Sequence, residues 1–341
     1  MKVGPNQRDP VFDAEWLAHR YDPEQDAVHF RHVPLSARAR ATFLTDEYLG
    51  VEPAPVPIGR ERISQSALPN APLHFVFHSA FCLSTLLANA LDLPGRSMSL
   101  KEPVILNDIV GWRHRGADGT RLTAVLLDAL QLCARPGPGR RAVVVKPSNI
   151  ANGLADGMLR LLPQARALLL HAPLEDYLIS IAKKQIDGRL WVRDLMVKQL
   201  REGLTLPVFS DEDLLRLTDL QVAAVGWLSQ HALFHRLCRA FPERVRTLDS
   251  ATITASPASV VQAMFAFYGI ALSDEERAQV LAGPAFTQHS KDGTAFGFSA
   301  RSLDYAAAES VHRDELTKVA AWARVVAETA GVPMALPNRL C

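Results

Sequence analysis

The stretch from Phe77 to Leu87, FHSAFCLSTLL, decides the fold of this chain. The apolar run Leu73–Phe77 before it has the length of a buried strand, and a helix is expected from Ser84 onward. In open parallel sheets, ligands bind beyond the carboxyl ends of the strands. Exposed N–H groups at a helix start also attract phosphate. The stretch is therefore predicted to bind the phosphate of a nucleotide, although Ser84 and Thr85 could equally serve only as helix caps.

Short apolar runs and helical segments alternate through the rest of the chain. Further strands are expected at Ser97–Leu100, Ala142–Val145, Ala167–Leu170 and Arg244–Leu248. Short buried strands separated by helices are typical of a parallel sheet with helices on both faces. We therefore predict a three-layer α/β fold with a central, mostly parallel sheet.

The first part of the chain has a different character. Residues 1–70 are expected to form an N-terminal elaboration, and residues 71–341 the nucleotide-binding domain. The Pro-rich stretch Val51–Ile58, VEPAPVPI, is the clearest linker, because each proline fixes φ and removes a backbone donor. A short helix is expected around Trp16 and a strand at Ala27–Phe30.

Composition narrows the class of protein. Thirty-seven basic and 36 acidic residues give a net charge of +1, which does not favour a broad nucleic-acid or membrane surface. No apolar run approaches the roughly 18 residues of a membrane-spanning helix, and no signal peptide is visible. The four cysteines have no zinc-site spacing. We expect a cytoplasmic protein with free thiols and no metal; the sequence does not indicate its oligomeric state.

Several familiar catalytic signatures are absent from the sequence. It contains no GxxxxGK[ST], no GxGxxG and no GxSxG, and no lysine stands directly before Ser84. ATP hydrolysis, ordinary kinase chemistry and serine hydrolysis are therefore disfavoured. His231 and His235 lie four residues apart, but on an apolar helix such a pair is more often packing than a metal site.

Four segments between Pro72 and Arg301 carry a family resemblance. They are FHSAFCLSTLL, RALLLHAPLEDYLISIAKK, RVRTLDSATITASPASVVQAMFAFYGI and QHSKDGTAFGFSAR. In this order and spacing they resemble the sulfotransferase family, which takes a sulfuryl group from 3'-phosphoadenosine-5'-phosphosulfate. The resemblance implies a P-loop nucleotide-binding, sulfotransferase-like architecture of the bacterial branch, with no metal cofactor.

The resemblance also implies which residues bind the donor. The 5'-phosphosulfate would lie on the loop residues Ser79, Ala80, Phe81, Cys82, Leu83, Ser84 and Thr85. Ser180 would bind the 3'-phosphate. The family's usual loop lysine or arginine and its Arg-Asp pair are replaced here by other residues, so substitute cations are needed. The candidates are Lys183, Lys184, Arg189 and Lys291, of which Lys184 and Lys291 are the predicted donor ligands.

Two further residues resemble catalytic groups of the tyrosylprotein and glycosaminoglycan sulfotransferases. Glu102 follows the second strand candidate, where those enzymes place a catalytic glutamate, and Lys146 ends the run AVVV. The alternatives are that Glu102 only caps a helix and that Lys146 is a solvated strand end. A lysine directly after three buried β-branched residues must lie near the ligand edge of a sheet, which favours a function.

The predicted function is sulfuryl transfer to a hydroxyl or amine of a small acceptor. Catalysis would depend on positioning and on cationic stabilisation of the leaving oxygen, as in phosphoryl transfer. Two alternatives remain: a nucleotide-binding scaffold of this fold that has lost its chemistry, which the missing loop lysine and arginine favour, and a phosphotransferase. No sequence motif identifies the acceptor.

Overall fold

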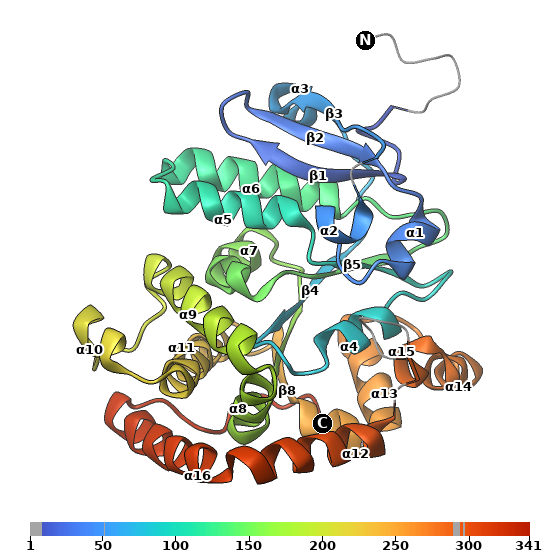
Figure 1. Cartoon of the computed structure of the whole chain (residues 1–341). Coiled ribbons are helices and arrows are strands. Elements are labelled where there is room, and N and C mark those ends of the chain that lie inside the picture. The colour runs from blue at the N-terminus through green and yellow to red at the C-terminus, as the bar shows by residue number, and fades with distance from the viewer. Residues whose placement is uncertain (1–8, 51, 289–293, 296) are drawn as a thin grey trace. The chain divides into compact units, whose positions relative to one another are not determined.

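The computed structural model describes residues 9–50, 52–288, 294–295 and 297–341 (Figure 1). The chain divides into two compact units, which are described separately. The first unit contains Met1–Val76, Thr85–Arg166 and Tyr268–Leu272, and the second contains Phe77–Ser84, Ala167–Phe267 and Ser273–Cys341.

An antiparallel sheet of three strands opens the first unit. It consists of β1 (Trp16–Asp22), β2 (Ala27–His32) and β3 (Val56–Gly59), in that order. The strand expected at Ala27–Phe30 is confirmed, but the helix expected around Trp16 is wrong. Trp16 pairs with His32 in the β1–β2 hairpin, and aromatic and buried residues of β1 suit a strand once a partner is present.

Five strands form the second sheet, in the order β5-β6-β4-β7-β8. They are β4 (Leu73–His78), β5 (Ser97–Lys101), β6 (Ala142–Lys146), β7 (Ala167–His171) and β8 (Val245–Asp249). The pairs β4–β6, β5–β6 and β7–β8 are parallel. β4, β5, β6 and β7 are buried along their whole length, as a parallel sheet between helices requires. The predicted α/β fold with a central parallel sheet is confirmed.

Helices of the first unit follow or precede its strands. They are α1 (Leu35–Arg40), α2 (Asp46–Leu49), α3 (Arg60–Ser64), α5 (Val104–His114), α6 (Gly119–Cys133), the 3₁₀ helix η1 (Asn149–Leu154) and α7 (Ala155–Leu161). α5 and α6 pack against β1 (Figure 1). The first residue of α4 (Ser84–Ala90) belongs to the second unit and the rest of the helix to the first.

The second unit is mainly helical. Its helices are α8 (Leu174–Lys183), α9 (Gln185–Arg201), α10 (Asp211–Arg216), α11 (Asp219–Ala240), α12 (Ser250–Ala255), α13 (Pro257–Tyr268), α14 (Asp274–Ala282), α15 (Pro284–Thr287) and α16 (Phe298–Ala330). α11 begins at a capping box, in which Thr218 accepts from the N–H of Gln221. α16 packs against α8 and α11. Among the described helices, none is both long and apolar enough to cross a bilayer.

Candidate functional site

The loop between β4 and α4 has an unusual backbone. Ala80, Phe81 and Leu83 have φ values of 73°, 52° and 64°, in the left-handed region that favours glycine. Such strain persists only where the surrounding structure imposes it, and it gathers at ligand-binding sites. Cys82 lies between two left-handed residues, and alternating conformations of this kind turn successive N–H groups into an anion-binding concavity. The loop predicted to bind phosphate therefore has a backbone suited to an anion.

Contacts inside the second unit hold this loop. The Ser79 N–H donates to the carbonyl of Leu170 at 3.0 Å, and the Cys82 thiol lies 3.6 Å from the same oxygen. The Ala80 N–H donates to His78 Nδ1 at 3.2 Å, so this N–H is already engaged. Ser79 Oγ, in contrast, is buried and has no hydrogen-bond partner among the described atoms. An orphaned buried hydroxyl beside a strained loop fits a phosphate oxygen as its partner.

Strain in the loop predicts the effect of one substitution. Ala80→Gly should raise the free energy of unfolding by about 0.5–1 kcal/mol, because relief of the left-handed strain exceeds the entropic cost of glycine. Ala307→Gly, at an exposed position inside α16, should lower it by about 1 kcal/mol. Urea unfolding of both variants measures the two effects. If Ala80→Gly destabilises the chain as much as Ala307→Gly does, the loop is not strained.

Aromatic side chains surround Phe81. Its ring centroid lies 5.9 Å from that of Tyr177 and 5.2 Å from that of Trp191. Lys184 Nζ lies 5.9 Å from the centre of the Phe81 ring, within the range of a cation–π contact. The Tyr177 hydroxyl is buried without a hydrogen-bond partner among the described atoms, and burial raises its pKa. The structure thus brings one predicted cation, Lys184, beside the loop.

The predicted 3'-phosphate ligand Ser180 is engaged by the chain itself. Ser180 Oγ donates to the carbonyl of Asp176 at 2.8 Å and lies 2.6 Å from the Tyr305 hydroxyl, on α16. Lys183 forms an ion pair with Asp304, also on α16. A phosphate could contact Ser180 and Lys183 fully only if these contacts with α16 were broken. The role of Ser180 stays a prediction.

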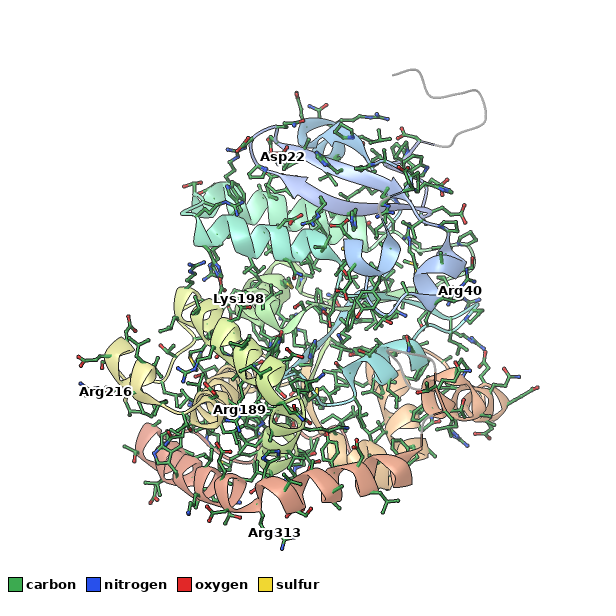
Figure 2. All side chains as sticks on the ribbon, in the orientation of Figure 1. Asp22, Arg40, Arg189, Lys198, Arg216 and Arg313 are labelled. Atoms are coloured by element: carbon green, nitrogen blue, oxygen red, sulfur yellow. The ribbon has the colours of Figure 1, made fainter. Side chains whose placement is uncertain are left out.

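The remaining predicted cations differ in their surroundings. Arg189, labelled on α9 in Figure 2, donates to Glu315 with an Nη2–Oε2 distance of 3.1 Å. Lys184 is exposed beside Phe81. Lys291 lies outside the described residues. Of the described candidates, Lys184 is therefore the one best placed to act at the loop.

Two residues at strand ends of the first unit form an ion pair. Lys146 Nζ donates to the carboxylate of Glu102, and the Glu102 N–H donates to the carbonyl of Lys146 at 2.7 Å. Lys146 is 1% exposed, whereas the Glu102 side chain is 17% exposed. Glu102 also has a left-handed backbone, with φ of 52°. The sequence predicted both residues at this sheet edge, and the structure brings them together.

A second buried lysine neighbours this pair. Lys101 is the register partner of Lys146 in the β5–β6 pair, and its Nζ donates to Asn89 Oδ1 at 2.8 Å and to the carbonyl of Ala39 at 2.9 Å. Burial, opposed by the charge of Asp92 and aided by that of Lys146, lowers the pKa of Lys101 to about 8. Lys146, the cation beside the carboxylate, can stabilise a negatively charged oxygen, while the carboxylate of Glu102 can accept a proton.

Some residues of these sites could not be found from the sequence. Tyr305 and Asp304 stand more than 120 positions after Ser180, and no motif marks them. Trp191 was also missed, because an aromatic residue inside a helix usually indicates packing alone. Among the described residues, no three His, Cys, Asp or Glu side chains are grouped as metal ligands would be.

Comparison with solved structures gives the following likenesses. A sulfotransferase domain from the curacin biosynthetic pathway matches 65% of this chain and 81% of its own length, with 15% identity and a TM-score of 0.40. Sulfotransferase STF9 from Mycobacterium avium matches 74% and 79%, with 14% identity and a TM-score of 0.42. A third, from Alicyclobacillus acidocaldarius, matches 62% and 91%, with 15% identity and a TM-score of 0.36. All three are sulfotransferases.

No protein-family model matches the chain, and no curated protein sequence does.

Proposed function

We propose that this chain transfers a sulfuryl group from 3'-phosphoadenosine-5'-phosphosulfate to a hydroxyl or amine of a small acceptor. The observation that carries the proposal is the strained loop at Ala80–Leu83, which follows a buried parallel strand and has Lys184 beside it. A loop without a preceding lysine suits a phosphate held mainly by backbone N–H groups. The unpartnered hydroxyl of Ser79 supplies one further donor.

The Lys146–Glu102 pair would supply the chemistry. The attacking acceptor oxygen forms a bond to sulfur, and the bond between sulfur and the phosphate oxygen breaks with its electron pair on that oxygen. Glu102 would accept the acceptor's proton, and the charge of Lys146 would stabilise an oxygen that becomes more negative in the transition state. When bound, the donor supplies an activated sulfuryl group, and the protein residues position it and balance charge.

A scaffold that binds nucleotide without chemistry is the second candidate. One observation favours it: the loop lysine or arginine and the Arg-Asp pair typical of the family are replaced here by other residues. A turnover measurement distinguishes the two candidates, because a scaffold would bind adenosine 3',5'-bisphosphate but would transfer no sulfuryl group.

Nucleotide binding is the first test of the proposal. At a hundred times its dissociation constant, adenosine 3',5'-bisphosphate should stabilise the chain by about 2.7 kcal/mol and raise the melting temperature by roughly 3 °C. ATP and NAD at equal concentration should give smaller shifts. No shift at millimolar adenosine 3',5'-bisphosphate, in protein shown to be folded, would remove the proposal.

Lys184 should contribute measurably to that affinity. A charge-assisted hydrogen bond to phosphate contributes about 1.5–3 kcal/mol, so Lys184→Ala should weaken binding of adenosine 3',5'-bisphosphate at least about tenfold. Lys198→Ala, on α9 and paired with Asp194, is the matched control and should bind like the parent. Calorimetric titration gives both constants. Equal affinities of the two variants would exclude Lys184 as a phosphate ligand.

A further inference from the structure

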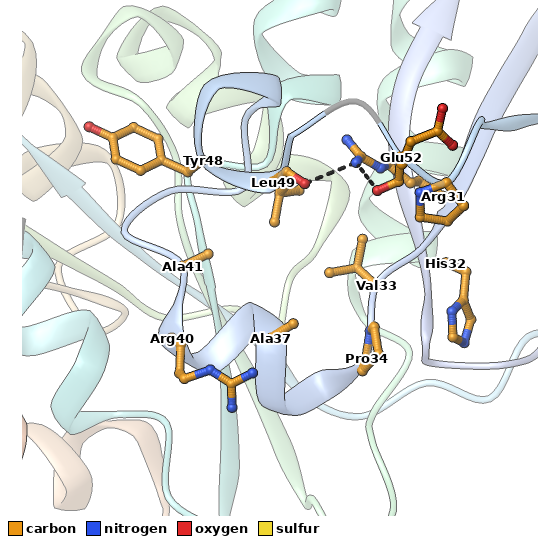
Figure 3. Close-up of a pocket in the computed structure, with 11 residues that line it drawn as sticks. Arg31, His32, Val33, Pro34, Ala37, Arg40, Ala41, Tyr48, Leu49 and Glu52 are labelled. Atoms are coloured by element: carbon orange, nitrogen blue, oxygen red, sulfur yellow. Dashed lines mark hydrogen bonds between the residues drawn. The ribbon is translucent and has the colours of Figure 1, made fainter.

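A cavity in the N-terminal part of the first unit has no role in the function described above. It has a volume of about 360 Å³ and lies between the end of β2, helices α1 and α2, and the segment after α2 (Figure 3). A volume in this range suits a small organic molecule. Its apolar lining comes from Val33, Pro34, Ala37, Ala41, Leu49 and Pro53.

Arg31 gives this cavity a fixed cation. Its side chain is 3% exposed, and its guanidinium donates to the carbonyl of Gly50 at 2.5 Å. It also donates to the carbonyls of Leu49 (3.0 Å) and Glu52 (2.6 Å), as Figure 3 shows. Three carbonyls hold the group in place but do not neutralise its charge. The third nitrogen of the guanidinium, Nε, is also buried and has no hydrogen-bond partner among the described atoms. A buried donor without an acceptor is costly, so the charge of Arg31 is held in place at an energetic cost.

Arg40 adds a second cation to the lining. It is exposed on α1 (Figure 2), and no described carboxylate lies within ion-pair distance of it. The acidic groups near the cavity are Glu52, which lines it, and Asp46, which lies 3.9 Å from Arg31 Nη1. Arg40 is thus the cation of the lining whose charge no described carboxylate balances at ion-pair distance. Guanidinium groups pair best with planar carboxylates.

The cavity is connected by aromatic contacts to the Lys146–Glu102 pair. Tyr48, which lines the cavity, meets Phe43 edge to face with ring centroids 5.3 Å apart. Lys146 Nζ lies 5.0 Å from the centre of the Phe43 ring. Burial raises the pKa of the Tyr48 phenol, and the negative charges of Glu47 and Glu102 add to this shift. These groups all belong to the first unit.

We propose that this cavity binds the acceptor, and that the acceptor is a small hydroxy acid with an apolar body and a carboxylate. The carboxylate pairs with Arg40, the buried charge of Arg31 adds to its attraction, and the body packs on the apolar lining. The hydroxyl extends past Tyr48 toward Glu102. The identification of this ligand as the acceptor rests on the proposed sulfotransferase function. The binding of a carboxylate in the cavity does not depend on that function.

Binding without donor tests the cavity directly. Three probe acids, 3-(4-hydroxyphenyl)propanoate, 4-hydroxybenzoate and 8-hydroxyoctanoate, are titrated into the full chain beside their uncharged methyl esters. At least one acid should bind about tenfold more tightly than its ester, as expected when a charge-assisted pair is lost. Arg40→Ala should weaken binding of that acid at least fivefold and leave the affinity for the ester unchanged. Arg160→Ala, an exposed arginine on α7 paired with Asp156, is the matched control and should stay within twofold of the parent.

Filling the cavity gives an independent variant. Ala37→Phe places a ring in the space and should weaken both acid and ester, provided that the melting temperature is kept. The proposal is overturned if no acid binds more tightly than its ester, or if Arg40→Ala and Arg160→Ala bind the acid alike.

The outcome is separable from that of the sulfotransferase proposal. Acid binding without a shift by adenosine 3',5'-bisphosphate supports the carboxylate site and refutes sulfuryl transfer. A nucleotide shift without acid binding supports the donor site and overturns the cavity assignment.

Discussion

Glu102→Gln is expected to lower turnover by about 10²–10⁴-fold, the usual contribution of a positioned general base. Glutamine keeps the shape of the side chain and can still accept a hydrogen bond from Lys146, but it cannot take a proton from the acceptor. Affinity for adenosine 3',5'-bisphosphate should remain close to that of the parent, because the loss falls on the transition state. Release of this nucleotide with a panel of hydroxyl- and amine-bearing acceptors measures turnover.

Stability must be recorded beside the kinetics. Lys146 is buried, and removal of the charge that balances it destabilises the fold by up to about 3–5 kcal/mol. Glu61→Gln, at an exposed carboxylate of the first unit, is the control and should change neither turnover nor melting temperature. A folded Glu102→Gln variant with turnover within about threefold of the parent would exclude Glu102 as the base.

Acidification should destabilise the first unit through His74. This side chain is 4% exposed, its ring stacks on Tyr268 with centroids 5.2 Å apart, and its Nδ1 accepts from the N–H of Arg166 at 3.2 Å. Burial, together with the charge of Arg166, lowers the pKa of His74 to about 4. The unfolded chain, with a pKa near 6.5, therefore binds the proton first. Stability from this group is complete above pH 6.5 and is lost progressively as the pH falls toward 4.

The size of the effect follows from the two pKa values. Between pH 7 and pH 4.5, the free energy of unfolding should fall by about 2.5 kcal/mol through His74 alone. His74→Asn places an acceptor near the same N–H without a group that titrates in this range. Between pH 7 and pH 4.5, the free energy of unfolding of this variant should therefore fall by about 2.5 kcal/mol less than that of the parent. His235→Asn, at a half-buried position on α11, should fall like the parent. Urea unfolding at both pH values measures these differences. Equal pH dependence of the parent and the two variants would contradict the prediction.

The sequence predicted the strands of the parallel sheet well because each is short, apolar and bounded by turn residues. Ala142–Val145, for instance, lies between Gly139 and Pro147 and forms the core of β6. The same pattern placed Glu102 and Lys146 at strand ends. What it could not give was their direct pairing, which depends on the register of β5 against β6 and on the left-handed backbone at Glu102.

Tertiary pairing explains the errors. The segment WLAHRYD has no strict alternation, so its strand character becomes apparent only when β2 pairs with it. The strain of the Ala80–Leu83 loop was equally hidden, since glycine is the usual signal of a left-handed turn and none is present. Long-range contacts of α16 leave no local pattern at all.

Those contacts make α16 a competitor of the proposed donor. Its Asp304 and Tyr305 give Lys183 and Ser180 the negative charge and the oxygen that a 3'-phosphate would otherwise provide. If the phosphate binds there, only the fraction of molecules in which these contacts are broken can accept it. The apparent dissociation constant then equals the intrinsic one divided by that fraction. Weak nucleotide binding by this chain would therefore reflect the stability of the α16 contacts as well as the intrinsic affinity of the loop for phosphate.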